Sequence, residues 1–231
     1  MSTPANTSQK SKQGFMPVLL VMCLILGLAS FAGWYVLSTN NDEPESLSSQ
    51  LSAQDAFKFA QPLPVSDVPF INEEGQTVGK KDTLGKWSFL FFGYTFCPDI
   101  CPTTLSVMQQ MWVQLSPELK AKNQIVFVSV DVERDTPEQL KTYMDYFETD
   151  FTALSGNLTS LHSFAAQLNA VYARVDRLND EGDIDPELGY LMDHSANIAI
   201  LDPEGNYYGF IKPPFTPKKM LSIVKTINNQ S

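Results

Sequence analysis

Apolar and polar positions along the chain change their spacing in an order that predicts a mixed α/β domain. Two continuous apolar runs, Trp87 to Gly93 and Ile125 to Val130, are typical of strands buried on both faces. Elsewhere apolar residues recur every three or four positions, which indicates helices. The predicted helices run through Leu105 to Leu115, open at Thr136-Pro137, span Leu158 to Leu168, and open at Thr216-Pro217.

Shorter patterns predict strands around this centre. An N-terminal β-hairpin is expected from Phe59 to Phe70 and Gln76 to Val78, and a third strand from Val171 to Val175. Asn197 to Leu201 and Tyr207 to Ile211, joined by a turn, make a closing hairpin. A strand-helix-strand unit followed by a hairpin and a helix is the thioredoxin-like arrangement. We therefore expect an α/β, thioredoxin-like fold over residues 57–231 with an added N-terminal β-hairpin.

The N-terminal quarter of the chain, residues 1–56, has a different pattern. Residues 1–14 are polar, and Phe15 to Leu37 carry no charge, a length that suits a membrane helix of roughly 20 residues. Lys10 and Lys12 precede this run, which predicts a single-pass inner-membrane anchor with a cytoplasmic N-terminus and a periplasmic C-terminal domain. The alternative is a signal peptide cleaved near Ala29 to Ala32. Residues 38–56 are polar and read as a linker.

Composition excludes some functions and isolates one pair of residues. The formal charge is -10 with no basic cluster, so nucleic acid is not an expected partner. Nothing in the acidic sequence indicates a stable dimer, and a monomer is expected. Of the three cysteines, Cys23 lies in the apolar N-terminal run. Cys97 and Cys101 therefore remain as a pair, which is too few for a disulfide scaffold but enough for one functional site.

The paired cysteines lie in the segment FFGYTFCPDICPTT, where a strand gives way to a helix. We expect Pro102 at the first helical position and Cys101 beside the helix N-terminus, where the dipole favours a thiolate. The spacing predicts an exposed, reversible dithiol or a soft-metal site. A static disulfide is the alternative, because residues four apart at a helix start can approach the required distance.

Three segments in order resemble the Sco/SenC family of membrane-anchored copper-handling proteins: FGYTFCPDICP, VSVDVERDTP and YLMDHSANIAILDPEG. Phe96 departs from the histidine often found before the first cysteine of that family. The resemblance implies that Cys97, Cys101 and His194 bind copper. Thiolates are soft donors that suit Cu(I), and imidazole can hold Cu(I) or Cu(II).

Several neighbouring residues have two interpretations. Asp193 either orients His194 or is solvated, and Met192 either contacts copper or, as favoured, packs in the core. Asp99 has a turn role or sets thiol acidity, while structural roles are favoured for Asp131 and Asp135. The acidic loop from Asp176 to Glu187 is a solvated insertion or a docking surface. Residues expected to have no part in the site are His162 on the surface and Met108 and Met111 in the core.

Two functions from different classes fit these residues. The resemblance implies a copper chaperone that delivers copper to the two-copper centre of cytochrome c oxidase subunit II. The alternative is an enzyme, a thiol-disulfide oxidoreductase that reduces the copper-ligand cysteines of the oxidase with Cys97 and Cys101 as its redox pair. His194 favours the chaperone, because a reductase has no need of a third soft-metal ligand.

Overall fold

The computed structural model describes residues 22, 24–28, 30–31, 46–180, 182–184 and 189–229. It divides the chain into two compact units, Met1–Ser46 and Leu47–Ser231. In the first unit the described residues from 22 to 31 are helical. The second unit contains all of the sheet, the core and the cysteine pair.

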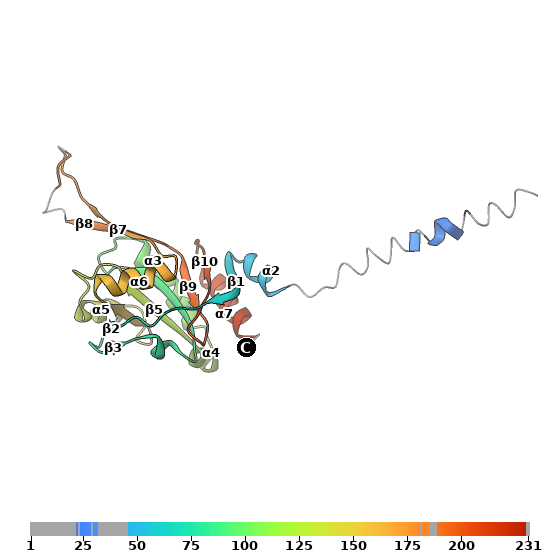
Figure 1. Cartoon of the computed structure of the whole chain (residues 1–231), viewed down its shortest axis with the longest axis horizontal. Helices are drawn as coiled ribbons and strands as arrows, with labels where there is room; N and C mark the ends of the chain where they lie inside the picture. The colour runs from blue at the N-terminus through green and yellow to red at the C-terminus, as the bar shows by residue number, and fades with distance from the viewer. Residues whose placement is uncertain are drawn as a thin grey trace, which may run out of the picture. The chain divides into compact units, whose positions relative to one another are not determined.

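An eight-stranded mixed sheet organises the second unit, with the strand order β1-β10-β9-β4-β5-β6-β2-β3 (Figure 1). Its strands are β1 (Ala56–Leu63), β2 (Phe70–Asn72), β3 (Thr77–Val78), β4 (Trp87–Gly93), β5 (Asn123–Ser129), β6 (Thr152–Ser155), β9 (Ile198–Leu201) and β10 (Tyr207–Ile211). Strands β4, β5 and β6 run parallel, whereas β9 pairs with β4 antiparallel. The closing hairpin of β9 and β10 is as predicted.

Helices cover both faces of the central strands, which explains why every residue of β4 is buried. They are α2 (Leu47–Ser52), α3 (Ile100–Trp112), α4 (Pro117–Lys122), α5 (Pro137–Met144), α6 (Leu158–Gln167) and α7 (Pro217–Asn228), with a 3-10 turn η1 (Lys80–Thr83). Phe91 contacts Phe127, which contacts Tyr143 of α5. Phe92, its neighbour on β4, contacts Phe164 of α6. Successive residues of a strand point to opposite faces, so α5 and α6 cover opposite sides.

Predicted helix starts are confirmed where a Thr-Pro pair stands. The hydroxyl of Thr136 accepts a hydrogen bond from the N–H of Gln139, and that of Thr216 accepts one from Lys219. In both helices the proline is the first helical residue, where its missing N–H costs nothing. These local signals depend on neighbouring residues alone and are readable without tertiary information.

Two strand predictions need correction, and one strand of the main sheet was not predicted. The predicted first strand of the N-terminal hairpin is two separate elements, because β1 pairs with β10 at one edge of the sheet. The actual hairpin joins β2 to β3, at the opposite edge. The strand predicted at Val171 to Val175 is β7 (Tyr172–Asp176), but among the described strands its partner is β8 (Tyr190–His194), in a separate two-stranded sheet. The third parallel strand is β6, whose four residues give too short a pattern to recognise.

The segment predicted as a linker contains a helix near its end. Helix α2 falls within residues 38–56, and Leu51 on it is fully buried. This helix packs against β1 and α7 and belongs to the second unit. Only one of its six residues is buried, so the sequence carries no apolar period there.

The predicted location in the inner membrane is not supported by the helices that the structure describes. Residues 1–14, most of 15–37 and Cys23 lie outside the described residues. Among the described residues, no helix combines the length and the apolar character needed to cross a bilayer. This finding overturns the prediction of a single-pass inner-membrane protein with a cytoplasmic N-terminus and a periplasmic domain.

Candidate metal centre

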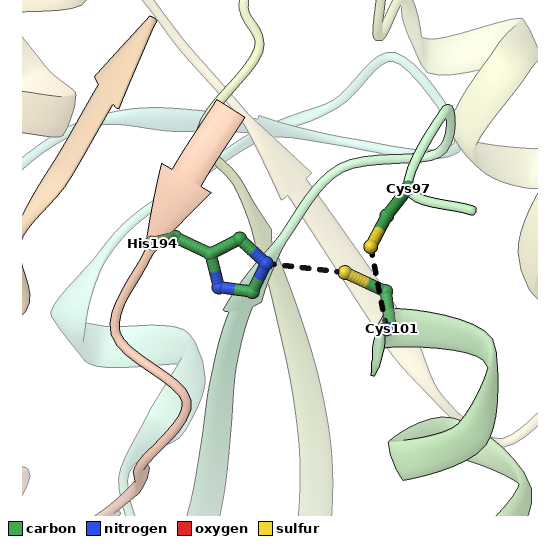
Figure 2. Close-up of side chains that lie close together, drawn as sticks. All are labelled: Cys97, Cys101 and His194. Carbon is green, nitrogen blue, oxygen red and sulfur yellow. Dashed lines mark hydrogen bonds between the residues drawn. The ribbon is translucent and has the colours of Figure 1, made fainter. Parts of the chain in front are cut away.

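Cys97, Cys101 and His194 come together in space although the histidine is 93 residues from the nearer cysteine (Figure 2). One ligand atom of each, two sulfurs and a ring nitrogen, lies within 4.8 Å of the other two. The cysteines come from the loop after β4 and the start of α3, and the histidine is the last residue of β8. Among the described residues, these three form the one cluster of histidine, cysteine or carboxylate side chains close enough together to hold a metal ion.

The cysteine loop places one sulfur in front of the helix and the other inside its first turn. Helix α3 begins at Ile100, two residues earlier than expected, so Pro102 is its third residue. The backbone N–H of Cys101 donates a hydrogen bond to Sγ of Cys97, at 3.5 Å. The positive end of the helix therefore favours charge on Cys97, not on Cys101 as predicted.

The two thiols consequently differ in acidity and in access. The hydrogen bond from the Cys101 thiol is the main cause that lowers the pKa of Cys97 to about 3, and the N–H groups of Asp99 and Cys101 add to it. The same hydrogen bond, together with burial, raises the pKa of Cys101 far above its usual range. Cys97 is 9% exposed and Cys101 is 0% exposed, so the prediction of an exposed dithiol is wrong and both cysteines are buried. The pair has one outer thiolate and one inner thiol.

The imidazole of His194 is oriented by backbone and aromatic contacts. Its Nδ1 lies 3.2 Å from the carbonyl oxygen of Ser195, which can only accept a hydrogen bond. Nδ1 therefore carries the proton, and the lone pair of Nε2 faces Sγ of Cys101 at 3.3 Å. The ring meets Phe91 and Tyr94 edge to face, with centroid distances of 5.8 and 6.0 Å. A bare ring nitrogen within 4.8 Å of two sulfurs is a donor set that suits a soft metal ion.

Gly93 is a site residue that sequence reasoning missed. A Cβ at this position would lie 2.9 Å from Sγ of Cys101 and 2.7 Å from the ring of Phe127. Its absence makes the room in which the inner sulfur lies. The available signal was a single glycine that ends a run of large apolar residues in a strand, since such a glycine often marks a close approach.

This donor set has a defined chemical preference. Two thiolate sulfurs and one imidazole nitrogen are soft or intermediate donors, which select Cu(I) over hard cations such as Mg²⁺ or Ca²⁺. In reduced form both cysteines are free and close together, so the same atoms are also a potential dithiol pair. The geometry is compatible with metal binding and with thiol chemistry.

A comparison with protein families identifies the chain. The family described as SCO1/SenC matches residues 63–229, which include the cysteine loop and His194. The chain belongs to the SCO1/SenC family. The Sco/SenC resemblance seen in the sequence is thereby confirmed.

Individual SCO1/SenC proteins agree with this assignment. A protein of Stutzerimonas stutzeri named for copper binding is 37% identical over 150 residues, which are 65% of this chain and 70% of that protein. The human mitochondrial protein SCO2 homolog is 33% identical over 218 residues, 89% of this chain and 75% of that protein. The copper-bound crystal structure of Arabidopsis thaliana ScoI superposes with a TM-score of 0.61 at 29% identity, covering 71% of this chain and 98% of that one. The thioredoxin-like Sco fold is therefore confirmed.

Two aspartates of the SCO1/SenC segment VSVDVERDTP are buried and structural. Asp135 accepts hydrogen bonds from the N–H and hydroxyl of Thr95 and from the hydroxyl of Ser129, so it holds the cysteine loop and does not cap a helix. Burial raises the pKa of Asp135. Asp131 accepts hydrogen bonds from Arg134 and Tyr190 instead. Both aspartates have a structural role, but the helix capping predicted for Asp135 is wrong, because Thr136 caps α5.

The remaining candidates have these places in the SCO1/SenC structure. Asp193 is exposed, on the opposite face of β8 from His194, and therefore does not orient the ring. Met192 shares the face of His194 and packs against the core, as favoured. His162 is exposed and stacks on Tyr172. Met108 and Met111 are buried in the core, as predicted. Asp99 is the exposed N-cap residue of α3, and its side chain makes no capping hydrogen bond. The acidic loop from Asp176 to Glu187 lies partly outside the described residues.

Proposed function

We propose that this SCO1/SenC protein binds copper through Cys97, Cys101 and His194 and delivers it to the two-copper centre of cytochrome c oxidase subunit II. The observation that carries the proposal is the meeting of two sulfurs and one bare ring nitrogen within 4.8 Å. The copper-bound Arabidopsis thaliana relative supports copper as the metal. The recipient is inferred from the family resemblance of the sequence.

Delivery of copper fits a site with few ligands. Three protein donors leave a Cu(I) ion open to further ligands, so a recipient can bind the ion before this protein has released it. Cys97 is the sulfur nearest to solvent, because it lies in the loop and Cys101 lies in the buried turn of α3. A ligand of the recipient would therefore reach the ion on the side of Cys97 and form a shared complex, in which each later exchange replaces one bond with another.

The experiment that tests copper binding compares the two histidines of the chain. His194→Ala removes the proposed ligand, whereas His162→Ala removes an exposed imidazole that stacks on Tyr172. Cu(I) affinity of the reduced protein is measured by competition with a chromophoric chelator. We expect His194→Ala to weaken binding at least about tenfold and His162→Ala to leave it unchanged. A His194→Ala variant that binds like the parent would contradict the proposed site.

Delivery is tested with the copper-binding fragment of oxidase subunit II. The copper-loaded protein is mixed with the metal-free, reduced fragment, and metal and thiol content are measured in each after separation. Movement of copper without formation of a disulfide in either protein is the expected result. Copper that stays with the SCO1/SenC protein at equilibrium would contradict delivery while leaving copper binding intact.

The unequal cysteines favour thiol-disulfide exchange as a second candidate function. The lowered pKa makes Cys97 a thiolate, and the buried Cys101 keeps its proton. This is the division between an attacking and a resolving cysteine. The Cys97 thiolate would attack a partner disulfide and form a mixed disulfide with it, and the first partner thiolate would leave. Cys101 would then lose its proton and attack Sγ of Cys97, which releases the second partner thiolate and moves two electrons to the partner.

The two candidate functions differ in their need for His194. Exchange requires the cysteine pair alone, whereas the metal site requires the imidazole as well. In a mixture with an oxidised subunit II fragment, His194→Ala should reduce the fragment as fast as the parent if exchange is the function. If His194→Ala stops copper transfer while thiol exchange is absent in the parent, the chaperone function holds and the exchange function fails.

A further inference from the structure

One arginine contacts both halves of the site from a third segment of the chain. Arg134 lies after β5, and its guanidinium carbon is 3.7 Å from the ring centroid of Tyr190 and 4.8 Å from that of Phe96. Tyr190 is the first residue of β8, which ends at His194. Phe96 immediately precedes Cys97. The guanidinium therefore lies against the strand that carries the histidine and the loop that carries the outer cysteine.

Hydrogen bonds fix the guanidinium in this place. Nη1 of Arg134 donates to the carbonyl oxygen of Tyr190, at 3.2 Å, and Nε donates to Oδ2 of Asp131. The hydroxyl of Tyr190 donates to Oδ1 of the same carboxylate, at 2.8 Å. Asp131 is 3% exposed, whereas the side chain of Arg134 is 25% exposed, so the carboxylate end of these contacts is buried and the guanidinium lies at the surface. We call Arg134, Asp131, Tyr190 and Phe96 the arginine clamp.

The arginine clamp keeps the same charges at pH values around neutral. Burial and the hydrogen bond to Asp131 raise the pKa of Tyr190 to about 12, so the phenol keeps the proton that it donates. The guanidinium is always charged. A hydrogen bond with a charged partner stabilises more than a neutral one. The clamp therefore does not depend on titration near neutral pH.

The histidine strand needs such support because it is not part of the main sheet. Strand β8 pairs with β7 alone among the described strands, in a separate two-stranded sheet. Its last residue is continuous with the loop to β9, so the end at His194 is tied to the core. Tyr190 lies four residues away, roughly 13 Å along an extended strand, and on the same face. Holding Tyr190 against the body fixes the tilt of β8, and with it the direction of the imidazole.

We propose that Arg134 is a positioning residue for His194: the arginine clamp holds β8 against the cysteine loop so that Nε2 of the imidazole faces the two sulfurs. Arg134 touches neither the metal nor a ligand atom and acts through Tyr190 and Phe96. The metal-binding consequence rests on the proposed function, but the orientation of the imidazole does not.

The first test measures copper affinity in a double-mutant cycle on the full chain. Arg134→Ala should lower Cu(I) affinity about tenfold, as loss of a supporting contact around a metal ligand does. In the His194→Ala background the same substitution should cause no further loss, because it acts through the histidine. Arg134→Lys keeps the charge but cannot stack and bridge in the same way, so it should resemble Arg134→Ala and provides a second variant if Arg134→Ala does not fold.

The second test needs no metal. Nitrogen NMR of the reduced, metal-free chain reports the ring of His194, whose Nδ1 proton is held by the Ser195 carbonyl. In the Arg134 variants we expect the His194 ring signals to shift and broaden, while those of His162 stay unchanged. Arg174→Ala is the matched control, since Arg174 stacks on Tyr190 at 3.9 Å but pairs with Glu133 and Asp176. It should leave the His194 signals in place.

The outcomes separate this inference from the proposed function. If the parent binds copper and the Arg134 variants bind it equally well, the positioning role is overturned. An equal loss of affinity in the parent and His194→Ala backgrounds also overturns it, because the effect then bypasses the histidine. If the parent binds no copper, the proposed function fails, and the NMR signals of His194 decide the positioning role alone: unchanged signals overturn it and displaced signals support it.

Discussion

The cysteine half and the histidine half of the site are anchored to the protein in different ways. Cys97 and Cys101 follow β4, which is buried along its whole length, and Cys101 lies in the first turn of a helix packed on the core. His194 ends a strand of a two-stranded sheet that is exposed on one face, where Leu191 and Asp193 lie. The sulfurs are held by the core, and the imidazole is held by a small number of contacts, those with Ser195, Phe91 and Tyr94.

This difference gives the two halves different tasks under the proposed function. Elements with few buried contacts open locally at a lower free energy than core strands do. The sulfurs then provide a fixed base for the ion, and the imidazole is the ligand whose withdrawal disturbs the least structure. Release of copper to a recipient would begin most easily at His194, while both sulfurs still hold the ion.

The largest expected effect comes from breaking the cysteine half. Replacing either Cys97 or Cys101 with Ser exchanges a soft thiolate for a hydroxyl that binds Cu(I) poorly, so high-affinity binding should be lost. Chelator competition on the reduced protein measures it. Cys23→Ser is the matched control, because it removes the third cysteine and keeps the pair. A single-cysteine variant with the affinity of the parent would show that the sulfurs do not act together.

The cysteine half can be sharpened further by alkylation at different pH values. With a pKa of about 3, Cys97 is a thiolate throughout the range above pH 5, so its rate of reaction with iodoacetamide should be flat from pH 5 to 8. An unperturbed cysteine has its pKa near 8.5, and its rate would fall about tenfold for each pH unit below that value. Cys101, whose pKa is raised and which is buried, should stay unlabelled.

Mass spectrometry of peptides that contain each cysteine separates the two rates. In the His194→Ala variant the rate at Cys97 should also be flat with pH, because the main cause of the lowered pKa is the Cys101 thiol and this contact is retained. A rate at Cys97 that rises tenfold per pH unit between pH 5 and 8 would contradict the assignment of the outer thiolate.

Crowding the inner sulfur should have a smaller, structural effect. In Gly93→Ala the new methyl group would lie 2.9 Å from Sγ of Cys101 and 2.7 Å from the ring of Phe127, and both neighbours are buried. We expect a loss of about 1–3 kcal/mol in the free energy of unfolding, the usual effect of overpacking a core. Urea denaturation of the metal-free protein measures this loss, and an unchanged midpoint would mean that the core around Cys101 adapts to the methyl group.

The same division explains what the sequence could predict. The cysteine half is local: β4, its turn and α3 are consecutive, so the apolar run and the paired cysteines indicate both the fold and the chemistry. The β9–β10 hairpin and the caps of α5 and α7 were also predictable from neighbouring residues.

The histidine half is not local. Strand β8 has an alternating pattern of half-buried and exposed residues and pairs with no described strand of the main sheet, so the sequence pattern does not show that its partner β7 lies outside that sheet. The family resemblance indicated His194 as a ligand, but not the contacts that orient it. Gly93 lies against Phe127, and Arg134 lies against Tyr190. The residues of each pair are distant in the sequence, so no periodicity of apolar positions predicts these contacts.

The smallest expected effect lies on the outer face of the histidine half. Asp193 is adjacent to His194 but points away from the site, opposite Ala173 of β7. The ring is oriented by the Ser195 carbonyl and by Phe91 and Tyr94, so Asp193→Ala should change the free energy of unfolding by no more than about 0.5 kcal/mol. Copper affinity should stay within about twofold of the parent, in contrast to the loss expected for His194→Ala. A tenfold loss of copper affinity in Asp193→Ala would mean that this carboxylate supports the imidazole. The exposed face of β8 would then take part in the site as well as the face that carries His194.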